Sequence, residues 1–321
     1  MRALGVFAVA LFGFAAPAAA SGPALTVPRS DMRAAFKCVG KVAHAKRTPL
    51  MIVSGTGVTG GQTYALGKPA LDAYGHPLCY MNYPDFMTAD IQVSVQYLVY
   101  GLRREFRLAG RKIAVYGISQ GGLLPRFALT YWPDLRRKVS DVLSAAGTQH
   151  GSTVDRCSAA DMCPPAGWQQ LRQSKLLRAL NSQPDETPGP VSYTTVRSLT
   201  DETVQPQGGR HPSSALEGAR NILIQDVCPG RRTTHIGTAV DSVTYAAFID
   251  AIRRRGEGKR GAAKVSELGA DVCSHPYAKG LDEGSTAALV SGAGGLVLDQ
   301  ILAAPKVSAE PKVRRVFRRT P

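Results

Sequence analysis

The chain has 321 residues, of which 44% are hydrophobic and 20% charged, so its composition excludes a disordered or fibrous protein. Its formal net charge is +15, because it contains 39 lysines and arginines and only 24 aspartates and glutamates. The basic runs do not carry aromatic residues interleaved in the pattern of nucleic-acid binding, which argues against such a partner. We expect a solvated basic surface that makes, at most, transient contact with anionic lipid surfaces.

The N-terminus has the pattern of a secretory signal peptide. Arg2 precedes an apolar stretch that reaches Phe14, and Ala18-Ala19-Ala20 supplies a small-residue cleavage site. An uncleaved membrane anchor is the alternative, but the apolar stretch is short for a bilayer span. We predict that residues 1–20 are removed and that the protein is secreted or associated with the cell envelope. No later stretch is expected to span a membrane.

All six cysteines follow the predicted cleavage site, at Cys38, Cys79, Cys157, Cys163, Cys228 and Cys273. An even number of cysteines in an oxidising compartment predicts three disulfides. The sequence leaves the pairing open, although Cys157 and Cys163 are close enough in the chain to pair with each other. Because no C-x-x-C motif is present, a zinc site is not expected. We expect neither a metal nor a cofactor.

Apolar runs typical of buried strands alternate along the chain with longer amphipathic stretches. The expected strands are 50–53, 113–116, 139–144, 193–196 and 221–224, and the expected helices are 87–106, 122–132 and 285–304. This alternation predicts an α/β fold, a mostly parallel central sheet flanked by helices. Residues 21–305 are expected to form one domain, followed by a basic C-terminal tail, 306–321. The apolar helix 285–304 either packs in the core or covers a hydrophobic cleft.

The most informative motif is Gly117-Ile118-Ser119-Gln120-Gly121, which matches the G-x-S-x-G pattern of a nucleophile elbow. In such an elbow a serine sits on a strained turn between a strand and a helix. The flanking segments, 113–116 and 122–132, provide that strand and that helix. The alternative is a glycine-rich turn with an inert serine. We predict that Ser119 is a nucleophile.

A serine nucleophile needs a histidine base that is oriented by a carboxylate. In α/β hydrolases the three residues follow the chain order Ser, Asp or Glu, His. Asp201 comes just after the strand 193–196, with Glu202 as its rival. The histidines after Ser119 are His150, His211, His235 and His275. His235 follows strand 221–224 by one loop, so we predict Ser119, Asp201 and His235 as the catalytic residues.

A tetrahedral intermediate also needs hydrogen-bond donors for its oxyanion. The N–H of Gln120, directly after the nucleophile, is one candidate. The glycine-rich loop 54–61 follows strand 50–53 and could turn further N–H groups inward. A phosphate-binding loop is excluded by the missing G-x-x-x-x-G-K-[ST] pattern, and a simple flexible turn is the remaining alternative.

Four segments together resemble the family of Candida antarctica lipase B and its secreted relatives. They are Gly55-Thr56-Gly57-Val58-Thr59-Gly60, Ser119-Gln120-Gly121-Gly122-Leu123, Trp168-Gln169-Gln170 and Thr200-Asp201-Glu202-Thr203-Val204-Gln205-Pro206-Gln207. The similarity runs from about Cys38 to Cys273. It implies an α/β-hydrolase fold and the same three catalytic residues. It also implies that Thr56, through its N–H and hydroxyl, and Gln120, through its N–H, form the oxyanion hole.

The same resemblance implies the disulfides Cys38–Cys79 and Cys228–Cys273, which leaves Cys157–Cys163. Three departures from the family pattern matter. Ile118 replaces a tryptophan that narrows the alcohol pocket, so alcohol selectivity is left open. Thr148 replaces a carboxylate of the acyl pocket. A disulfide between Cys157 and Cys163 would stiffen the segment that resembles a lid, which predicts weak or absent interfacial activation.

The resulting functional prediction is a secreted serine ester hydrolase that acts on acylglycerols or other apolar carboxylic esters. Ser119 would form the acyl-enzyme, His235 would transfer the proton, and water would release the acid. A short-chain carboxylesterase or polyester hydrolase is the nearest alternative. An acyltransferase of the cell envelope would use the same acyl-enzyme with an alcohol acceptor. A non-catalytic binding protein on a hydrolase scaffold is the remaining alternative.

Overall fold

The computed structural model describes residues 21–318 except 156, 158–161, 255–262 and 270, so the predicted signal peptide lies outside the described residues. In this part of the chain seven strands form one sheet, in the order β1-β3-β2-β4-β5-β6-β7. They are β1 (Phe36–Val39), β2 (Leu50–Val53), β3 (Leu78–Met81), β4 (Ile113–Ile118), β5 (Val139–Ala145), β6 (Ser192–Arg197) and β7 (Arg220–Leu223). Only β1 is antiparallel to its neighbour. The predicted α/β fold with a mostly parallel sheet is confirmed.

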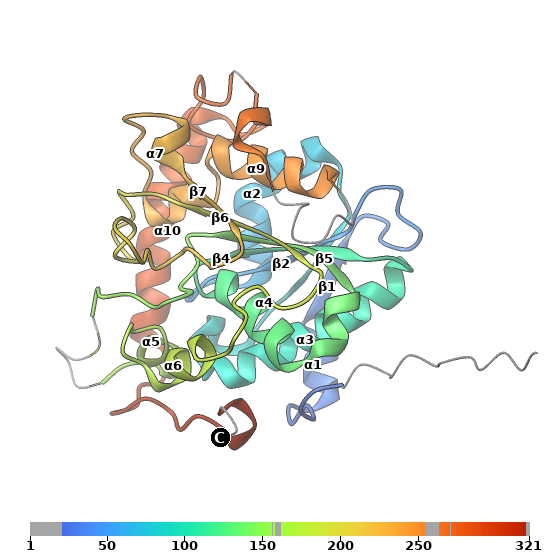
Figure 1. Cartoon of the computed structure of the whole chain (residues 1–321), viewed down its shortest axis with the longest axis vertical. Coiled ribbons are helices and arrows are strands. Elements are labelled where there is room, and N and C mark those ends of the chain that lie inside the picture. The colour runs from blue at the N-terminus through green and yellow to red at the C-terminus, as the bar shows by residue number, and fades with distance from the viewer. Residues whose placement is uncertain (1–20, 156, 158–161, 255–262, 270, 319–321) are drawn as a thin grey trace, which may run out of the picture.

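Helices cover both faces of the sheet (Figure 1). One layer contains α1 (Arg29–Ala35), α3 (Ile91–Ala109), α4 (Gln120–Tyr131) and α6 (Lys175–Asn181). The other contains α2 (Gly60–Tyr74), α7 (Ile224–Val227) and α9 (Ser242–Arg253). Side chains alternate along each strand, so Met51 and Val53 pack with the first layer while Leu50 and Ile52 pack with the second. The described residues also form short elements: α5 (Pro165–Gln169), α8 (His235–Thr238), η1 (Pro84–Met87), η2 (Pro133–Arg137), η5 (Val265–Glu267) and η6 (Arg315–Phe317).

The edge strand β1 and its neighbour β3 are absent from the sequence-based expectation, because each has only four residues and β1 exposes two of them. They pair so that Cys38 lies directly opposite Cys79, and a disulfide joins these two residues. The structure also links Cys157 to Cys163 and Cys228 to Cys273. These are the pairings that the family resemblance implies.

Helix α10 (Glu283–Ala303) lies on the surface, and Thr286 is its only buried residue. Its outward leucines are largely exposed, with Leu289 at 56% and Leu296 at 63%. By length and composition alone the helix is apolar enough to cross a membrane, with a mean hydropathy of 1.4. One such helix is weak evidence for a membrane span, so the expectation that no later stretch spans a membrane stays a prediction.

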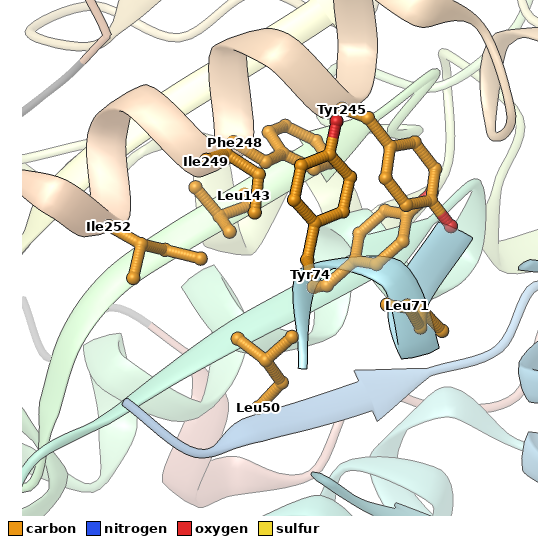
Figure 2. A pocket seen from close by; sticks show the side chains of 9 residues that line it. Leu50, Leu71, Tyr74, Leu143, Tyr245, Phe248, Ile249 and Ile252 are labelled. Atoms are coloured by element: carbon orange, nitrogen blue, oxygen red, sulfur yellow. The ribbon is translucent and has the colours of Figure 1, made fainter. Parts of the chain in front are cut away.

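An apolar pocket lies inside the second helical layer, between the sheet and helices α2 and α9 (Figure 2). Tyr74 and Tyr245 stack across it, and Leu50 and Leu143 contribute from the strands. None of the predicted catalytic or oxyanion-hole residues lines this pocket. It therefore belongs to the packing of the core, and the candidate site has to be found elsewhere.

Two buried glutamines of α3 hold both ends of the described chain. The side-chain oxygen of Gln96 accepts hydrogen bonds from the N–H groups of Thr26 and Val27. One turn earlier, Gln92 donates to the carbonyl of Lys312 and accepts from the N–H of Arg314. The described part of segment 306–321 thus packs against the domain, and the segment's last three residues lie outside the described residues.

Candidate active site

Ser119 lies on a strained turn between β4 and α4. Its backbone has φ 56° and ψ −123°, a conformation that costs a residue with a side chain on the order of 1–3 kcal/mol. The turn is tight because glycines permit close contact: a Cβ on Gly117 would lie 1.9 Å from the carbonyl oxygen of Gly121. A Cβ on Gly121 would lie 2.3 Å from the carbonyl oxygen of Val53. The sequence Gly-x-Ser-x-Gly therefore adopts the backbone geometry of a nucleophile elbow.

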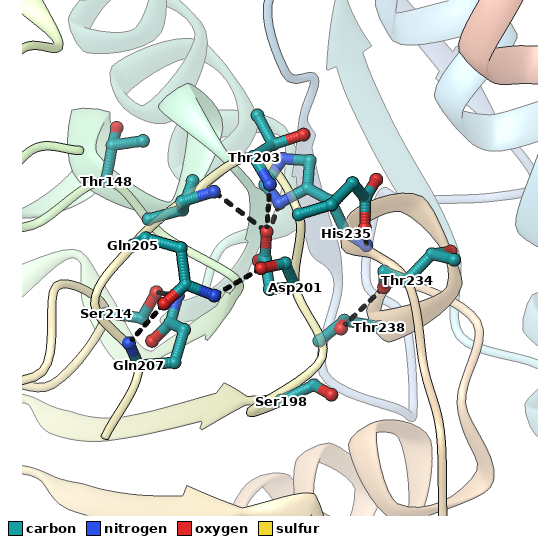
Figure 3. A network of polar contacts seen from close by, with 12 residues as sticks. Thr148, Ser198, Asp201, Thr203, Gln205, Gln207, Ser214, Thr234, His235 and Thr238 are labelled. Carbon is teal, nitrogen blue, oxygen red and sulfur yellow. Dashed lines mark hydrogen bonds and ion pairs between the residues drawn. The ribbon is translucent and has the colours of Figure 1, made fainter. Parts of the chain in front are cut away.

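Asp201 and His235 form a buried pair. Asp201 follows β6, and His235 opens α8 in the loop region after β7. The imidazole Nδ1 lies 2.8 Å from Asp201 Oδ2 (Figure 3). The other carboxylate oxygen of Asp201 accepts two backbone hydrogen bonds, from Thr203 and Val204, each at 2.8 Å. These bonds fix the carboxylate, which in turn fixes the ring and its tautomer, with the proton on Nδ1.

Glu202, the rival of Asp201, faces a different atom of the same histidine. Its carboxylate accepts a hydrogen bond from the backbone N–H of His235 at 2.9 Å, not from the ring. The remaining histidines lie apart from this pair. His150 is close to Glu186, His275 pairs with Glu283 on the surface, and His211 is exposed. Of the two carboxylates, Asp201 is the one that contacts the ring of His235, and the other three histidines do not take part in this pair.

Parallel strands bring the three residues to one edge of the sheet. Ser119 follows β4 and Asp201 follows β6, and both strands pair in parallel with β5 between them. His235 comes after β7, the parallel neighbour of β6. In the described structure the hydroxyl of Ser119 is not hydrogen bonded to the imidazole. Such contacts are commonly long without substrate and shorten when the substrate binds.

The loop after β2 lies against the nucleophile. A Cβ on Gly55 would come within 3.1 Å of the Ser119 Cβ, so this loop approaches the serine closely. The next residue, Thr56, donates its hydroxyl proton to the side-chain oxygen of Gln120 at 2.7 Å. Within the described chain, the N–H groups of Thr56 and Gln120 have no acceptor. Two unpaired N–H donors beside a strained serine provide what an oxyanion requires.

A further polar residue, Gln170, joins this loop and is not among the sites predicted from the sequence. Its Nε2 donates to the hydroxyl of Thr56 at 2.9 Å. Its Oε1 accepts from the hydroxyl of Thr148 at 3.1 Å. The only sequence signal for it is its place in the Trp168-Gln169-Gln170 segment of the family resemblance.

Helix α10 passes over the same edge of the sheet. A Cβ on Gly57 would lie 2.9 Å from Val297, and a Cβ on Gly237, two residues after His235, would lie 3.8 Å from Val290. The helix therefore spans the distance between the Thr56 loop and the His235 helix. Of the two alternatives for this segment, a roof over the site fits the structure, and a buried core helix does not.

The disulfide segment next to the site is held on several sides. Cys163 forms a two-way backbone bridge with Val307, just after α10. The indole N–H of Trp168 donates to the carbonyl of Val307 at 2.9 Å. Residues 156 and 158–161 of this segment lie outside the described residues. The described part is thus tied to α5 and to the chain that leaves α10.

The residues described by the structure contain no group of three or more histidine, cysteine, aspartate or glutamate side chains that could hold a metal ion. The polar groups of the site are the serine, the Asp201–His235 pair, two backbone N–H donors and a set of threonine and glutamine side chains. This set matches the needs of nucleophilic acyl transfer: a nucleophile, an oriented base and oxyanion donors.

Comparison with known proteins shows which proteins the chain is similar to. No protein-family model matches the chain. Lipase B of Pseudozyma antarctica is 31% identical to it over 300 residues, which cover 91% of this chain and 85% of that protein. The crystal structure of Aspergillus fumigatus lipase B superimposes with a TM-score of 0.85 at 26% identity, over 99% of this chain and 77% of that one.

Proposed function

Because the chain belongs to the lipase B family and is a carboxylic-ester hydrolase with the α/β-hydrolase fold, we propose that it cleaves apolar esters, including acylglycerols, through an acyl-enzyme on Ser119. The observation that carries the proposal is the buried Asp201–His235 pair, which lies at the same sheet edge as the strained Ser119 elbow. The apolar surface of α10 beside this edge favours an apolar substrate.

The reaction proceeds in two acyl-transfer steps. His235 Nε2 takes the proton of Ser119 as the hydroxyl oxygen attacks the ester carbonyl, and Asp201 stabilises the resulting imidazolium. The N–H groups of Thr56 and Gln120, with the Thr56 hydroxyl, bind the oxyanion. Collapse of the intermediate expels the alcohol, which takes the proton from His235. Water then attacks the acyl-enzyme while His235 takes a proton from the water. His235 returns this proton to Ser119 as the carboxylic acid leaves.

The direct test is labelling with an alkyl fluorophosphonate, followed by peptide mass spectrometry. We expect a single adduct on Ser119 and none in the Ser119→Ala variant. His235→Ala should lose both labelling and turnover, whereas His275→Ala, which changes an exposed histidine, should keep both. Labelling of another residue, or turnover by Ser119→Ala near that of the native enzyme, would refute the assignment.

A short-chain carboxylesterase is the second candidate, and one observation favours it. Cys163 is tied to Cys157 by a disulfide and to Val307 by a backbone bridge, which restricts the movement of these residues that an opening lid would need. Rates on nitrophenyl esters of increasing chain length, and then on emulsified triglyceride, separate the two candidates. A lipase hydrolyses the emulsion, with little or no jump in rate as the interface forms. Activity confined to short soluble esters would favour the esterase.

We also propose that the protein is exported and cleaved after Ala20. Three disulfides in the structure support an oxidising compartment. Intact mass and N-terminal sequencing of protein from a secreting host should show Ser21 as the first residue. A chain that retains Met1 and stays with the cells would contradict export.

A further inference from the structure

The hydrogen bonds around Gln170 determine which way the proton of the Thr56 hydroxyl points. Gln170 Nε2 lies 3.1 Å from the backbone carbonyl of Ala166, and a carbonyl can only accept. The amide nitrogen must therefore face Ala166, and the same NH₂ group reaches Thr56 Oγ1 with its second hydrogen. The two partners therefore determine which terminal atom of the Gln170 amide is nitrogen and which is oxygen.

Two consequences follow from this orientation. First, Gln170 Oε1 faces Thr148, so the Thr148 hydroxyl must be the donor in that bond. Second, the Thr56 oxygen already accepts a hydrogen bond from Gln170, so its own single proton points elsewhere. In the structure it points to the side-chain oxygen of Gln120, the residue directly after the nucleophile. The hydrogen bonds therefore run in one direction: Thr148 donates to Gln170, Gln170 donates to Thr56, and Thr56 donates to Gln120.

We propose that Gln170, held by Thr148, is a positioning residue that keeps the Thr56 hydroxyl a donor toward the oxyanion. The inference rests on the proposed function, in which Thr56 lines the oxyanion hole. When the tetrahedral intermediate forms, the Thr56 proton moves its hydrogen bond from Gln120 to the oxyanion. Gln170 occupies the acceptor side of the hydroxyl throughout, so no large reorientation of Thr56 is needed.

Whether the side chain at position 170 can donate a hydrogen bond therefore decides where the Thr56 proton points. A carboxylate there accepts hydrogen bonds and donates none, so it would draw the Thr56 proton to itself and away from the oxyanion. Removal of one oxyanion donor typically lowers kcat about 10²- to 10³-fold. We expect Gln170→Glu to lower kcat by about 10²-fold on a short nitrophenyl ester, with KM changed by less than about threefold.

A double-mutant cycle tests the coupling. Thr56→Val removes the hydroxyl and should lower kcat by a similar factor. In the Thr56→Val background, Gln170→Glu should change kcat by less than about twofold, because no Thr56 proton remains to be misdirected. Equal losses from Gln170→Glu in both backgrounds would show a merely structural role and overturn the proposal. An unchanged kcat in Thr56→Val would overturn it as well.

Position 148 supplies an independent variant in case Gln170→Glu disturbs folding. Thr148→Val keeps the shape of the side chain and removes its proton, so kcat should fall several-fold, whereas Thr148→Ser should restore it to within about twofold. Equal kcat in the valine and serine variants would refute the role of Thr148. Rates are expressed per site labelled by fluorophosphonate. Labelling reports on Ser119 itself, so a native enzyme that is not labelled would refute the proposed function. If labelling succeeds and the double-mutant cycle shows no coupling, only this inference is refuted.

Discussion

At the scale of single residues, the elbow depends on the absence of side chains around Ser119. Gly117 and Gly121 each lie so close to a backbone carbonyl that a side chain at either position would clash with it. The strained conformation of Ser119 persists because its N–H donates to the carbonyl of Ala145, and its own carbonyl accepts from Gly122. The geometry of the elbow is thus maintained by contacts between backbone segments, which side-chain substitutions elsewhere would disturb little.

We expect Gly117→Ala to open the elbow, because its Cβ would lie 1.9 Å from Gly121 oxygen. Stability should fall by about 3 kcal/mol or more, and turnover by at least about 10²-fold. Gly292→Ala is the matched control, since a Cβ at this site on α10 meets nothing within 4 Å. Denaturant midpoints and rates of both variants check the prediction, and a Gly117→Ala variant as active as the control would contradict it.

The two neighbouring carboxylates after β6 have separable roles. Asp201→Asn should leave the fold intact and lower kcat by about 10⁴-fold, because an amide no longer enforces the His235 tautomer with a proton on Nδ1. Glu202→Gln retains an oxygen that accepts from the His235 N–H, so its kcat should stay within about tenfold of the native value. Steady-state rates and thermal midpoints measure both. Comparable losses in the two variants would contradict the assignment of Asp201 as the orienting acid.

At the scale of elements, β5 carries a buried carboxylate that the mechanism does not use. Asp141 is 2% exposed, and burial raises its pKa to about 6. In the unfolded chain an aspartate has a pKa of about 3.9. Between these values the native state binds more protons than the unfolded state, so the free energy of unfolding falls as the pH rises from about 4 to about 6. The total loss is on the order of 3 kcal/mol.

Asp141→Asn should remove this pH dependence. The variant should gain stability relative to the native protein as the pH rises through this window, and the difference should level off above about pH 6. Urea midpoints measured from pH 4 to 7 provide the test. Asp72→Asn, which changes a carboxylate with half of its side-chain surface exposed, is the control for the loss of an aspartate that is not buried. A constant difference between the Asp141→Asn variant and the native protein at every pH would count against the prediction.

The elements that could be predicted from the sequence are those with a strong local pattern. Strands β2 and β4 through β7 and helices α3 and α10 follow from apolar runs and helical spacing, with ends displaced by a few residues. Helix α4 begins at Gln120, earlier than expected, so Pro125 lies inside it and not in its first turn. The missing N–H of Pro125 leaves the Gly121 carbonyl without its helical partner, at the point where it packs against Gly117.

Contacts between distant segments could not be predicted in this way. The chain order identifies Asp201 and His235 because their loops follow adjacent strands. Gln170 gains its partners only when the loops after β2 and β5 fold against α5, and no local pattern encodes that meeting. For the same reason a single phenylalanine in a basic run, Phe317, gave no sign that the last segment packs onto the domain.

At the scale of the whole molecule, Phe317 anchors the C-terminal segment. It is 1% exposed and packs against the rings of Phe127, Tyr131 and Trp132. The segment that it holds starts at the end of α10 and includes Glu310, whose carboxylate accepts from the first N–H groups of α6. The anchor therefore stabilises one end of the helix that covers the candidate active site.

Phe317→Ala should lower the free energy of unfolding by about 3–5 kcal/mol, because it leaves a cavity among three rings. Val316→Ala, at a neighbouring side chain that is 55% exposed, should change it by less than about 0.5 kcal/mol. Chemical denaturation of the two variants gives both values. Similar values for the two would mean that the segment contributes little to stability.

Because α3 binds segments near both ends of the described chain, these two ends lie close together. Arg314 donates to the hydroxyl of Thr26 at 3.2 Å, so two segments 288 residues apart in sequence meet beside the same helical turn. A short linker between them would close the backbone into a ring without moving α3. New termini could then be cut in the exposed loop at Gly209, where a Cβ would meet nothing within 4 Å. Such a circular permutant should fold and keep its esterase activity, since every strand-to-loop connection around Ser119 is retained.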